Sequence, residues 1–109
     1  MKESVIEEYL IKRVTEAGGE IRKLAWLGRR NAPDRLVGFP ASEPITIAGI
    51  YTFSPRPPRH ALVELKAPKK NPPAAQTREH DRLRAIGFDV WVLNTKRKVD
   101  NFMRYYAER

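Results

Sequence analysis

An apolar segment over residues 60–67 carries an acidic and a basic side chain two positions apart, Glu64 and Lys66. Alternate residues of a β-strand point to the same side of the sheet. A strand here therefore places the carboxylate and the ammonium group on one side and the apolar neighbours on the other. This segment constrains the chain to a sheet that presents both charged groups together at one surface.

A second carboxylate is expected close to this pair. Asp34 follows Pro33 in a basic turn and opens a short strand over residues 34–39. If that strand lies next to residues 60–67, Asp34 comes beside Glu64. Two carboxylates at one point repel each other unless a cation joins them. Mg²⁺ takes oxygen ligands and keeps several water molecules, so two or three carboxylates suffice to hold it.

These groups predict metal-dependent cleavage of a phosphodiester bond. A divalent cation lowers the pKa of a water molecule and offsets negative charge in the transition state. Lys66 would orient or activate the attacking water, or stabilise the charge of the transition state. The alternative is a charged strand face on which Glu64 and Lys66 simply pair with each other.

The rest of the chain predicts alternating helices and strands. Residues 3–17 repeat apolar side chains at helical spacing and end before two glycines. Asn71 is expected to cap a second helix that has prolines at its first positions. Strands are expected over 20–27, 34–39, 60–67 and 88–93, and helices over 3–17, 72–86 and 99–106. Residues 40–59 form an insertion in which 45–53 predict a β segment or hairpin arm.

This order of elements, α-β-β-β-α-β-α, predicts one α/β domain over residues 1–109, with a mixed β-sheet flanked by helices. The apolar row of the first helix is formed by Ile6, Leu10, Val14 and Ala17. Glu3 and Glu7 lie on a neighbouring row of the same helix, at the edge of the buried stripe. Either of them is a candidate for a third acid, and Glu7 is preferred. The alternative is an exposed glutamate that the helix dipole favours in the first turn.

Two polar residues of the second helix lie on one row, because Gln76 and His80 are four positions apart and Leu83 continues the row. That row should meet the sheet. Gln76 could then bond a metal-held water, a ligand carboxylate or a phosphate. His80 could contact the residues that bind the metal without binding the metal itself. The alternative is a polar helix start in contact with water.

The chain is strongly basic, with 21 lysines and arginines against 13 acidic residues and a formal net charge of +8. This balance favours nucleic acid or another anionic surface as the partner, with a merely solvated basic face as the alternative. Several basic residues bracket the acidic ones in sequence and are candidates for phosphate contacts. They are Lys23, Arg29, Arg30, Arg35, Arg56, Arg59, Lys69 and Lys70.

The sequence also excludes some classes of protein. It contains no cysteine, which rules out disulfides and cysteine-based zinc sites. No apolar run approaches the roughly 20 residues that span a bilayer, and the N-terminal residues do not form a secretory signal. We therefore expect a cytoplasmic protein without a membrane contact or an organic cofactor.

The motifs together resemble the VRR-NUC domain family of the PD-(D/E)XK nuclease superfamily. The resemblance covers about residues 3–102. It is carried by Gly18-Gly19 and Lys23, by Pro33-Asp34-Arg35-Leu36, by Val63-Glu64-Leu65-Lys66-Ala67-Pro68, and by Gln76 and Leu83 with Gly87. Two departures are Asn31-Ala32, where the family is expected to have a glycine before Pro-Asp, and the long interval between Asp34 and Glu64.

The resemblance implies a restriction-endonuclease-like fold and a DNase that depends on Mg²⁺ or Mn²⁺. By position, Asp34 and Glu64 would bind metal together with Glu7 or Glu3, Lys66 would be the catalytic lysine, and Gln76 the glutamine of the family. Small members of this type resemble Holliday-junction resolvases and are expected to act as homodimers on branched DNA, in a bacterial or phage setting and in DNA repair. The alternatives are a non-catalytic DNA-binding module and a catalytic subunit that requires a larger partner.

Overall fold

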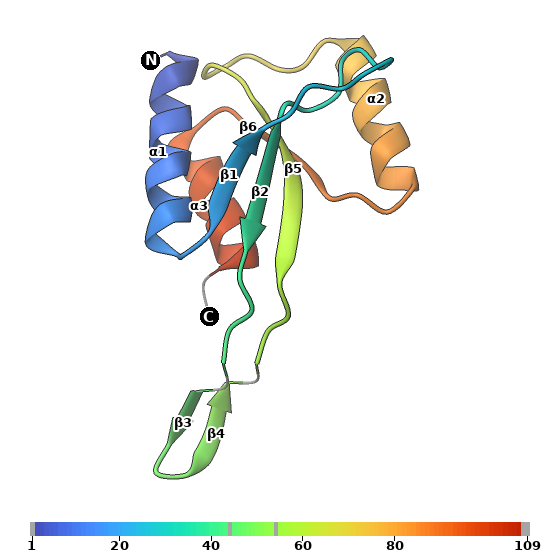
Figure 1. Cartoon of the computed structure of the whole chain (residues 1–109). Coiled ribbons are helices and arrows are strands. Elements are labelled where there is room, and N and C mark those ends of the chain that lie inside the picture. Colours follow the sequence, from blue (N-terminus) through green and yellow to red (C-terminus); the bar gives the residue numbers. More distant parts are fainter. Residues whose placement is uncertain (1, 44, 54, 108–109) are drawn as a thin grey trace.

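The computed structural model describes residues 2–43, 45–53 and 55–107. Three helices and six strands follow one another along the chain (Figure 1). In chain order they are α1 (Glu3–Glu16), β1 (Glu20–Lys23), β2 (Arg35–Phe39), β3 (Ile45–Ile47), β4 (Ile50–Phe53), β5 (Arg59–Leu65), α2 (Ala74–Ala85), β6 (Val90–Leu93) and α3 (Lys96–Tyr106). The predicted α/β fold with a mixed sheet flanked by helices is confirmed.

Four strands form the main sheet in the order β1-β2-β5-β6. The β1–β2 and β2–β5 pairs are antiparallel, and the β5–β6 pair is parallel. Helix α2 lies between β5 and β6 in the chain, as a connection between parallel strands requires. The register opposes Arg35 of β2 to Val63 of β5, so the start of β2 lies beside the end of β5. The polar residues at these two strand ends are thereby brought together.

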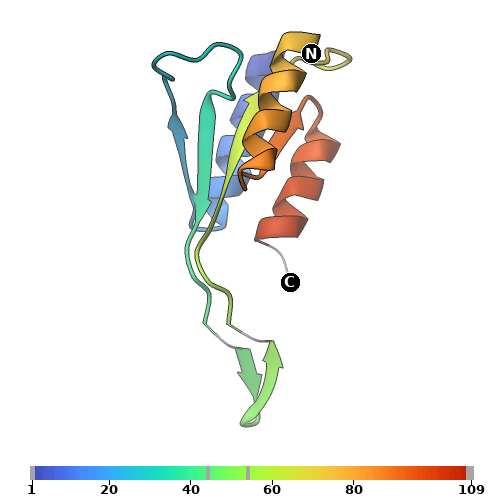
Figure 2. The same ribbon diagram turned by 90° about the vertical axis from the view of Figure 1, so that its right-hand side faces the viewer.

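Helices α1 and α3 cover one face of the sheet, as the two views show (Figure 2). Ile6, Leu10 and Val14 of α1 are fully buried, as the helical spacing predicts, whereas Ala17 lies beyond the end of the helix and is exposed. The buried side chains of this face form one cluster. It also contains Val37, Phe39, Ala61, Val63, Leu65, Leu93, Val99, Phe102, Met103 and Tyr106.

Helix α2 covers part of the other face. Leu62, Leu83 and Val90 form a smaller buried cluster there, and Leu24 and Trp26 pack against it. Glu64 alternates with Val63 and Leu65 along β5, so its side chain points to this second face, toward α2. The polar site is thus built on the face that carries the smaller core.

The inserted stretch contains a two-stranded hairpin, β3–β4, which extends away from the body of the protein (Figure 1). Ala48 and Gly49 both have positive φ angles, 54° and 77°, as a tight two-residue hairpin turn requires. An isolated antiparallel bridge between Ser42 and Arg56 lies between this hairpin and the main sheet. The expectation of a hairpin within residues 45–53 is confirmed.

Several element boundaries were predicted wrongly, those of the two later helices among them. Helix α2 begins at Ala74 rather than at Pro72, and its N-cap is Pro73 with no side-chain hydrogen bond, so Asn71 is not the cap. A residue that precedes a proline is disfavoured in the helical conformation, which keeps Pro72 out of the helix. Helix α3 begins earlier than predicted, because the Thr95 hydroxyl accepts a hydrogen bond from the Lys98 backbone N–H at 3.1 Å.

Several strands are also shorter than predicted at one end. Strand β1 ends at Lys23, so residues 24–27 start a loop; β5 ends at Leu65 rather than at Ala67, and β6 begins at Val90 rather than at Phe88. Within the described part of the chain, no helix combines the length and the apolar character needed to cross a membrane.

Candidate active site

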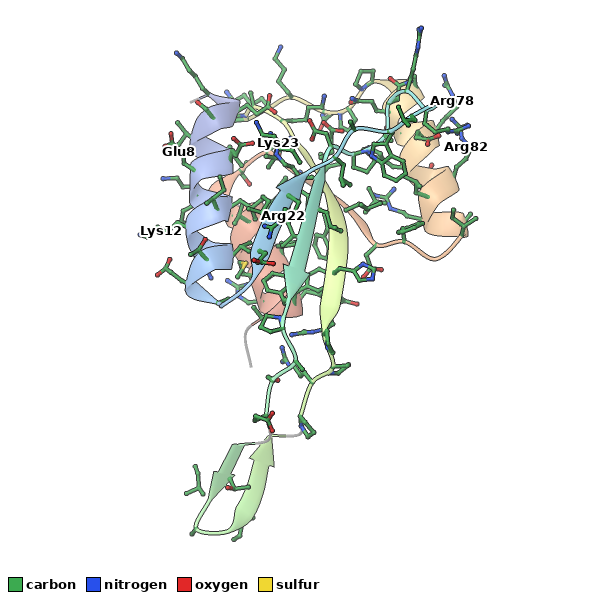
Figure 3. The ribbon with its side chains drawn as sticks, viewed as in Figure 1. Glu8, Lys12, Arg22, Lys23, Arg78 and Arg82 are labelled. Atoms are coloured by element: carbon green, nitrogen blue, oxygen red, sulfur yellow. The ribbon has the colours of Figure 1, made fainter. Side chains whose placement is uncertain are left out.

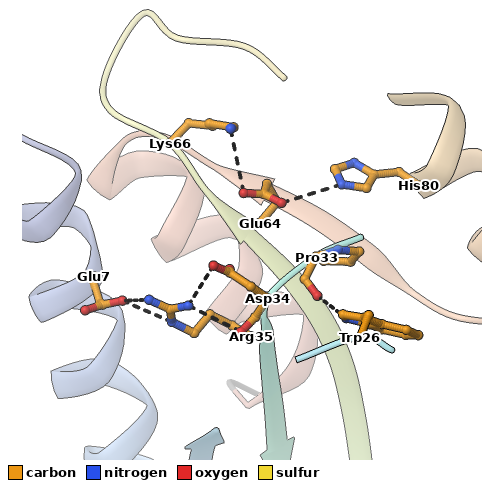
Figure 4. A network of polar contacts seen from close by, with 8 residues as sticks. All are labelled: Glu7, Trp26, Pro33, Asp34, Arg35, Glu64, Lys66 and His80. Carbon is orange, nitrogen blue, oxygen red and sulfur yellow. Dashed lines mark hydrogen bonds and ion pairs between the residues drawn. The ribbon is translucent and has the colours of Figure 1, made fainter. Parts of the chain in front are cut away.

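The loop of residues 24–34 fixes the position of Asp34. The backbone N–H of Leu24 donates to the Asp34 carbonyl oxygen at 2.9 Å, and the indole Nε1 of Trp26 donates to the Pro33 carbonyl oxygen at 2.7 Å (Figure 4). Both ends of the loop are therefore tied together next to the start of β2. Asp34 is half exposed at this point, with 53% of its side chain accessible.

Strand β5 presents Glu64 and Lys66 to the same place. The Glu64 side chain is almost fully buried, with 9% of it exposed, and the Lys66 Nζ lies 3.7 Å from Glu64 Oε2. Lys66 comes directly after the last residue of β5, but its backbone N–H still donates to the Leu93 carbonyl oxygen at 3.1 Å. The parallel pairing with β6 thus holds the Glu-x-Lys segment in extended conformation to its end.

The electrostatic environment of Glu64 is unusual for a carboxyl group. Burial first, and then the negative charge of Asp34, raise the pKa of Glu64 to about 7. Lys66 and Arg35 lower the pKa, and Glu3 raises it further, but these effects do not restore the ordinary value. In the protein without a cation, burial and the charge of Asp34 therefore disfavour ionisation of Glu64. A positive ion at this point would favour the ionised carboxylate.

The two candidate acids of α1 differ in their surroundings. Glu7 accepts hydrogen bonds from the Nε and Nη2 of Arg35, and the same guanidinium lies 3.0 Å from Asp34 Oδ2 through its Nη1 (Figure 4). Glu3, one turn earlier at the exposed start of the helix, acts on the charge of Glu64. The Glu7 carboxylate is thus bonded to Arg35. Glu3 is the helix acid whose charge acts on Glu64.

The polar row of α2 faces the same point, as its spacing predicts. His80 is buried, and its Nε2 lies 3.9 Å from Glu64 Oε1, beyond hydrogen-bond distance. Burial lowers the pKa of His80 below its usual range, with Arg84 as a second cause, so the imidazole is neutral at neutral pH. The Gln76 Oε1 and His80 Nε2 atoms are buried and have no hydrogen-bond partner among the described residues. Buried polar atoms normally have a partner, so this row has capacity for a ligand or water.

These residues fit a divalent cation with few protein ligands. No group of three or more histidine, cysteine or acidic side chains gathers tightly enough to form a complete metal cage within the described ranges. The oxygen donors are the Asp34 and Glu64 carboxylates, and the Gln76 amide oxygen, one helical turn before His80, is also buried without a partner among the described residues. This oxygen-rich and incomplete set suits Mg²⁺, which takes oxygen ligands and retains several waters.

The predicted phosphate-binding residues are not all free or close to the acids. The Arg35 side chain is only 13% exposed and is bonded to Glu7, while Arg29 donates to the buried carboxylate of Glu79 through Nε, at 3.2 Å, and Nη2. Arg59 lies at the other end of β5, about 17 Å along the strand from Glu64. Arg56 lies beside the hairpin, where its Nη1 donates to the Tyr106 carbonyl oxygen at 3.4 Å.

The remaining basic residues lie near the acidic end of the sheet. Lys23 is the last residue of β1 and is paired in register with Arg35. Lys69 and Lys70 are exposed in the loop that follows β5, and the Asn94 Nδ2 donates to the Lys70 carbonyl oxygen at 2.7 Å. Arg30 is exposed in the loop that precedes Asp34. Their roles in DNA binding stay predictions.

Two structural supports of the site were not predicted. Trp26 anchors Pro33, and Glu79 joins the loop of Arg29 to α2. The sequence signal for Glu79 was its place between Arg78 and Arg82 on one helix. It also directly precedes His80, which lies in the row that faces the sheet. The signal for Trp26 was weaker, because an indole in an apolar segment packs in a core far more often than it anchors a loop.

Comparison with known proteins identifies the class. No family model matches the chain. A solved structure described as "VRR_NUC domain" superposes with a TM-score of 0.68 and 32% sequence identity, over 97% of this chain and 98% of that one. The mixed sheet with helices on both faces is therefore the fold of a VRR-NUC domain.

A curated phage protein places the chain in the same family. It is named "Putative nuclease p44", from Acyrthosiphon pisum secondary endosymbiont phage 1, and is 36% identical over 96 residues, which cover 88% of this chain and 86% of that protein. The chain belongs to the VRR-NUC nuclease domain family, as the motifs around Asp34 and Glu64 predict.

Proposed function

We propose that this protein is a divalent-metal-dependent endonuclease that hydrolyses phosphodiester bonds in DNA. The observation that carries the proposal is the buried Glu64, which lies beside the charge of Asp34 and within 3.7 Å of the Lys66 ammonium group. Burial of an ionisable carboxyl group beside another acid costs folding free energy, and groups perturbed in this way cluster at functional sites. Binding Mg²⁺ or Mn²⁺ is the task that this donor set supports best.

In this proposal each residue has a defined role. Asp34 and Glu64 would hold the cation, and Glu3 is favoured over Glu7 as the third acid because Arg35 occupies Glu7. When bound, the cation would act as a Lewis acid that lowers the pKa of a water molecule and offsets charge on the phosphate. The Lys66 ammonium group would orient that water or stabilise the negative charge that develops.

Gln76 would complete the water site, because its buried Oε1 can accept a hydrogen bond from the attacking water. The water oxygen would form a bond to phosphorus as the bond from phosphorus to the 3′ oxygen breaks; the water would give up a proton to solvent, and the leaving 3′ oxygen would take a proton from solvent. His80, neutral and 3.9 Å from Glu64, would shape the position of that carboxylate.

We further propose that the enzyme is a homodimer and prefers branched DNA, such as a four-way junction. Two active sites are needed for paired incisions in two strands, and one chain supplies one site. The hairpin β3–β4 is the candidate contact with the second copy. Between Arg35 and Arg56 the sequence has no lysine or arginine, although the chain carries 21 of them. Ile47 and Ile50 at the tip of the hairpin are 65% and 70% exposed, which suits contact with protein and not with phosphate.

The dimer is tested by the mass of the protein in solution. Wild type should elute at twice the monomer mass in size-exclusion chromatography with light scattering. The double variant Ile47→Asp and Ile50→Asp should elute as a monomer. A monomeric wild type at micromolar concentration would refute the dimer, and a dimeric double variant would refute the role of the hairpin.

The catalytic proposal is tested with a labelled four-way junction and a linear duplex of the same sequence, in Mg²⁺, Mn²⁺ or EDTA. Wild type should cut the junction in a metal-dependent way and Lys66→Ala should not. Equal cleavage of the junction and the duplex would refute the preference for branches. Binding without cleavage in any metal would instead favour a non-catalytic DNA-binding module or a subunit that requires a larger partner.

A further inference from the structure

A cluster of charged residues where α2 meets the loop of residues 24–34 is not used by the catalytic proposal. Its centre is Glu79, whose residue surface is only 2% exposed. The Glu79 carboxylate accepts hydrogen bonds from Arg29 and, at 3.0 Å, from the Nε of Arg82. These hydrogen bonds lower the pKa of Glu79, with Arg29 as the main cause, so the carboxylate is firmly ionised. One buried anion thus fixes two cations that come from different segments of the chain.

Both guanidinium groups still reach solvent. The side chains of Arg29 and Arg82 are 51% and 59% exposed. Within the described part of the chain, Arg82 bonds Glu79 through its Nε alone, so its terminal nitrogens are available to an outside acceptor. Arg78 lies one helical turn before Arg82, is exposed, and forms no ion pair in the described part (Figure 3).

The arrangement has a net positive charge that a purely structural role does not require. Arg29 and Arg82 bond the one carboxylate of Glu79, and Arg78 directly precedes Glu79 in α2, so the three arginines and the glutamate carry a net charge of two positive units. Like charges four residues apart on a helix are destabilising, so Arg78 and Arg82 cost the helix some stability. A single arginine in a bidentate pair would already satisfy a buried carboxylate.

We propose that Arg29 and Arg82, held in place by Glu79, form together with the exposed Arg78 a binding site for the phosphates of one DNA strand that leads into the active site. This inference rests on the proposed nuclease function. Glu79 directly precedes His80, whose Nε2 lies 3.9 Å from Glu64 Oε1, and Arg29 lies in the loop that ends at Asp34, so short segments of the chain connect this site to both acids. Exposed guanidinium groups in a fixed arrangement match phosphate oxygens in geometry and charge. Glu79 is a positioning residue, because it acts through the arginines.

The test is the salt dependence of DNA binding in EDTA, where cleavage does not interfere. A fluorescent linear duplex is titrated with wild type, with Arg78→Gln/Arg82→Gln, and with the control Lys12→Gln/Arg104→Gln. The control removes the same number of charges from exposed positions on α1 and α3. Each lost phosphate contact lowers the slope of log K against log salt by about 0.9. The α2 variant should therefore lose about 1.8 from the slope, and the control should keep the slope of wild type.

Glu79→Gln separates positioning from net charge. It removes one negative charge, so simple electrostatics predicts tighter DNA binding. Loss of the fixed arrangement of the arginines predicts weaker DNA binding. Circular dichroism checks that the variant is folded. Equal slopes for the α2 variant and the control would overturn the site, and tighter binding by Glu79→Gln would overturn the role of Glu79. If wild type cleaves DNA in either case, the nuclease proposal stands; if wild type neither binds nor cleaves DNA, both proposals fall.

Discussion

Glu64→Gln should make the metal-free protein more stable while abolishing its activity. The folded-state pKa of Glu64 is about 7, against 4.5 for an unperturbed glutamate. Between these two values the folded protein holds a proton that the unfolded chain has released, so the stability of wild type falls as the pH rises through this window. The loss is complete above pH 7.

The size of the effect follows from the difference between the two pKa values. At roughly 1.4 kcal/mol per pH unit, ionised Glu64 destabilises the folded state by about 3 kcal/mol at pH 8. Glutamine has nearly the same shape and no charge, so it avoids this cost. The variant should exceed wild type by about 3 kcal/mol at pH 8, and the gap should vanish near pH 4.5.

The assay is urea unfolding in EDTA at several pH values between 4.5 and 8, with the exposed Glu8→Gln as the control that should follow wild type at every pH. Mg²⁺ at 100 times its Kd should then stabilise wild type by about 2.7 kcal/mol and leave Glu64→Gln unchanged. Parallel stability curves for wild type and Glu64→Gln would show that burial beside Asp34 does not perturb this carboxyl. A variant that is less stable at pH 8 would show that the attraction of Lys66 outweighs burial.

Three further predictions concern activity and packing. Lys66→Ala should keep the fold, seen by circular dichroism, and lose at least 100-fold in cleavage rate, as loss of a transition-state contact of this type costs; retained cleavage would exclude the lysine from the mechanism. Gly19→Ala should destabilise the protein by roughly 1–3 kcal/mol in urea unfolding, because a Cβ at this position would lie 2.6 Å from the Gly38 carbonyl oxygen; an unchanged midpoint would show that β2 can move away. Tyr106→Phe should cost about 1–3 kcal/mol, since its hydroxyl donates to Asp89 at 2.6 Å, and a thermal melt identical to that of wild type would contradict this.

The sequence by itself determined which elements form and which of their sides are buried. The helical spacing of Ile6, Leu10 and Val14 identified the buried side of α1, and all three are fully buried. The alternation of side chains along residues 60–67 placed Glu64 and Lys66 on one side of β5. These features are local: a period of 3.6 or 2 residues decides which side of an element is buried, whatever the rest of the chain does.

Element boundaries were less predictable, because they depend on single residues and on pairing with distant ones. Two consecutive prolines delayed α2 to Ala74, and the hydroxyl of Thr95 began α3 ahead of its apolar row. Strand β1 ended at Lys23, since the loop that follows is tied to Pro33 by Trp26 and cannot continue the ladder.

Only the tertiary structure decided the partners of the charged groups. Glu7 and Glu3 are equivalent by helical spacing, but the register of β2 brings Arg35 to Glu7 and leaves Glu3 to act on Glu64. In the same way Arg29 donates a hydrogen bond to the buried Glu79, 50 residues away in the chain. A charged side chain gains or loses free energy according to the group it faces, and that group is set by the packing of distant segments, which no local pattern records.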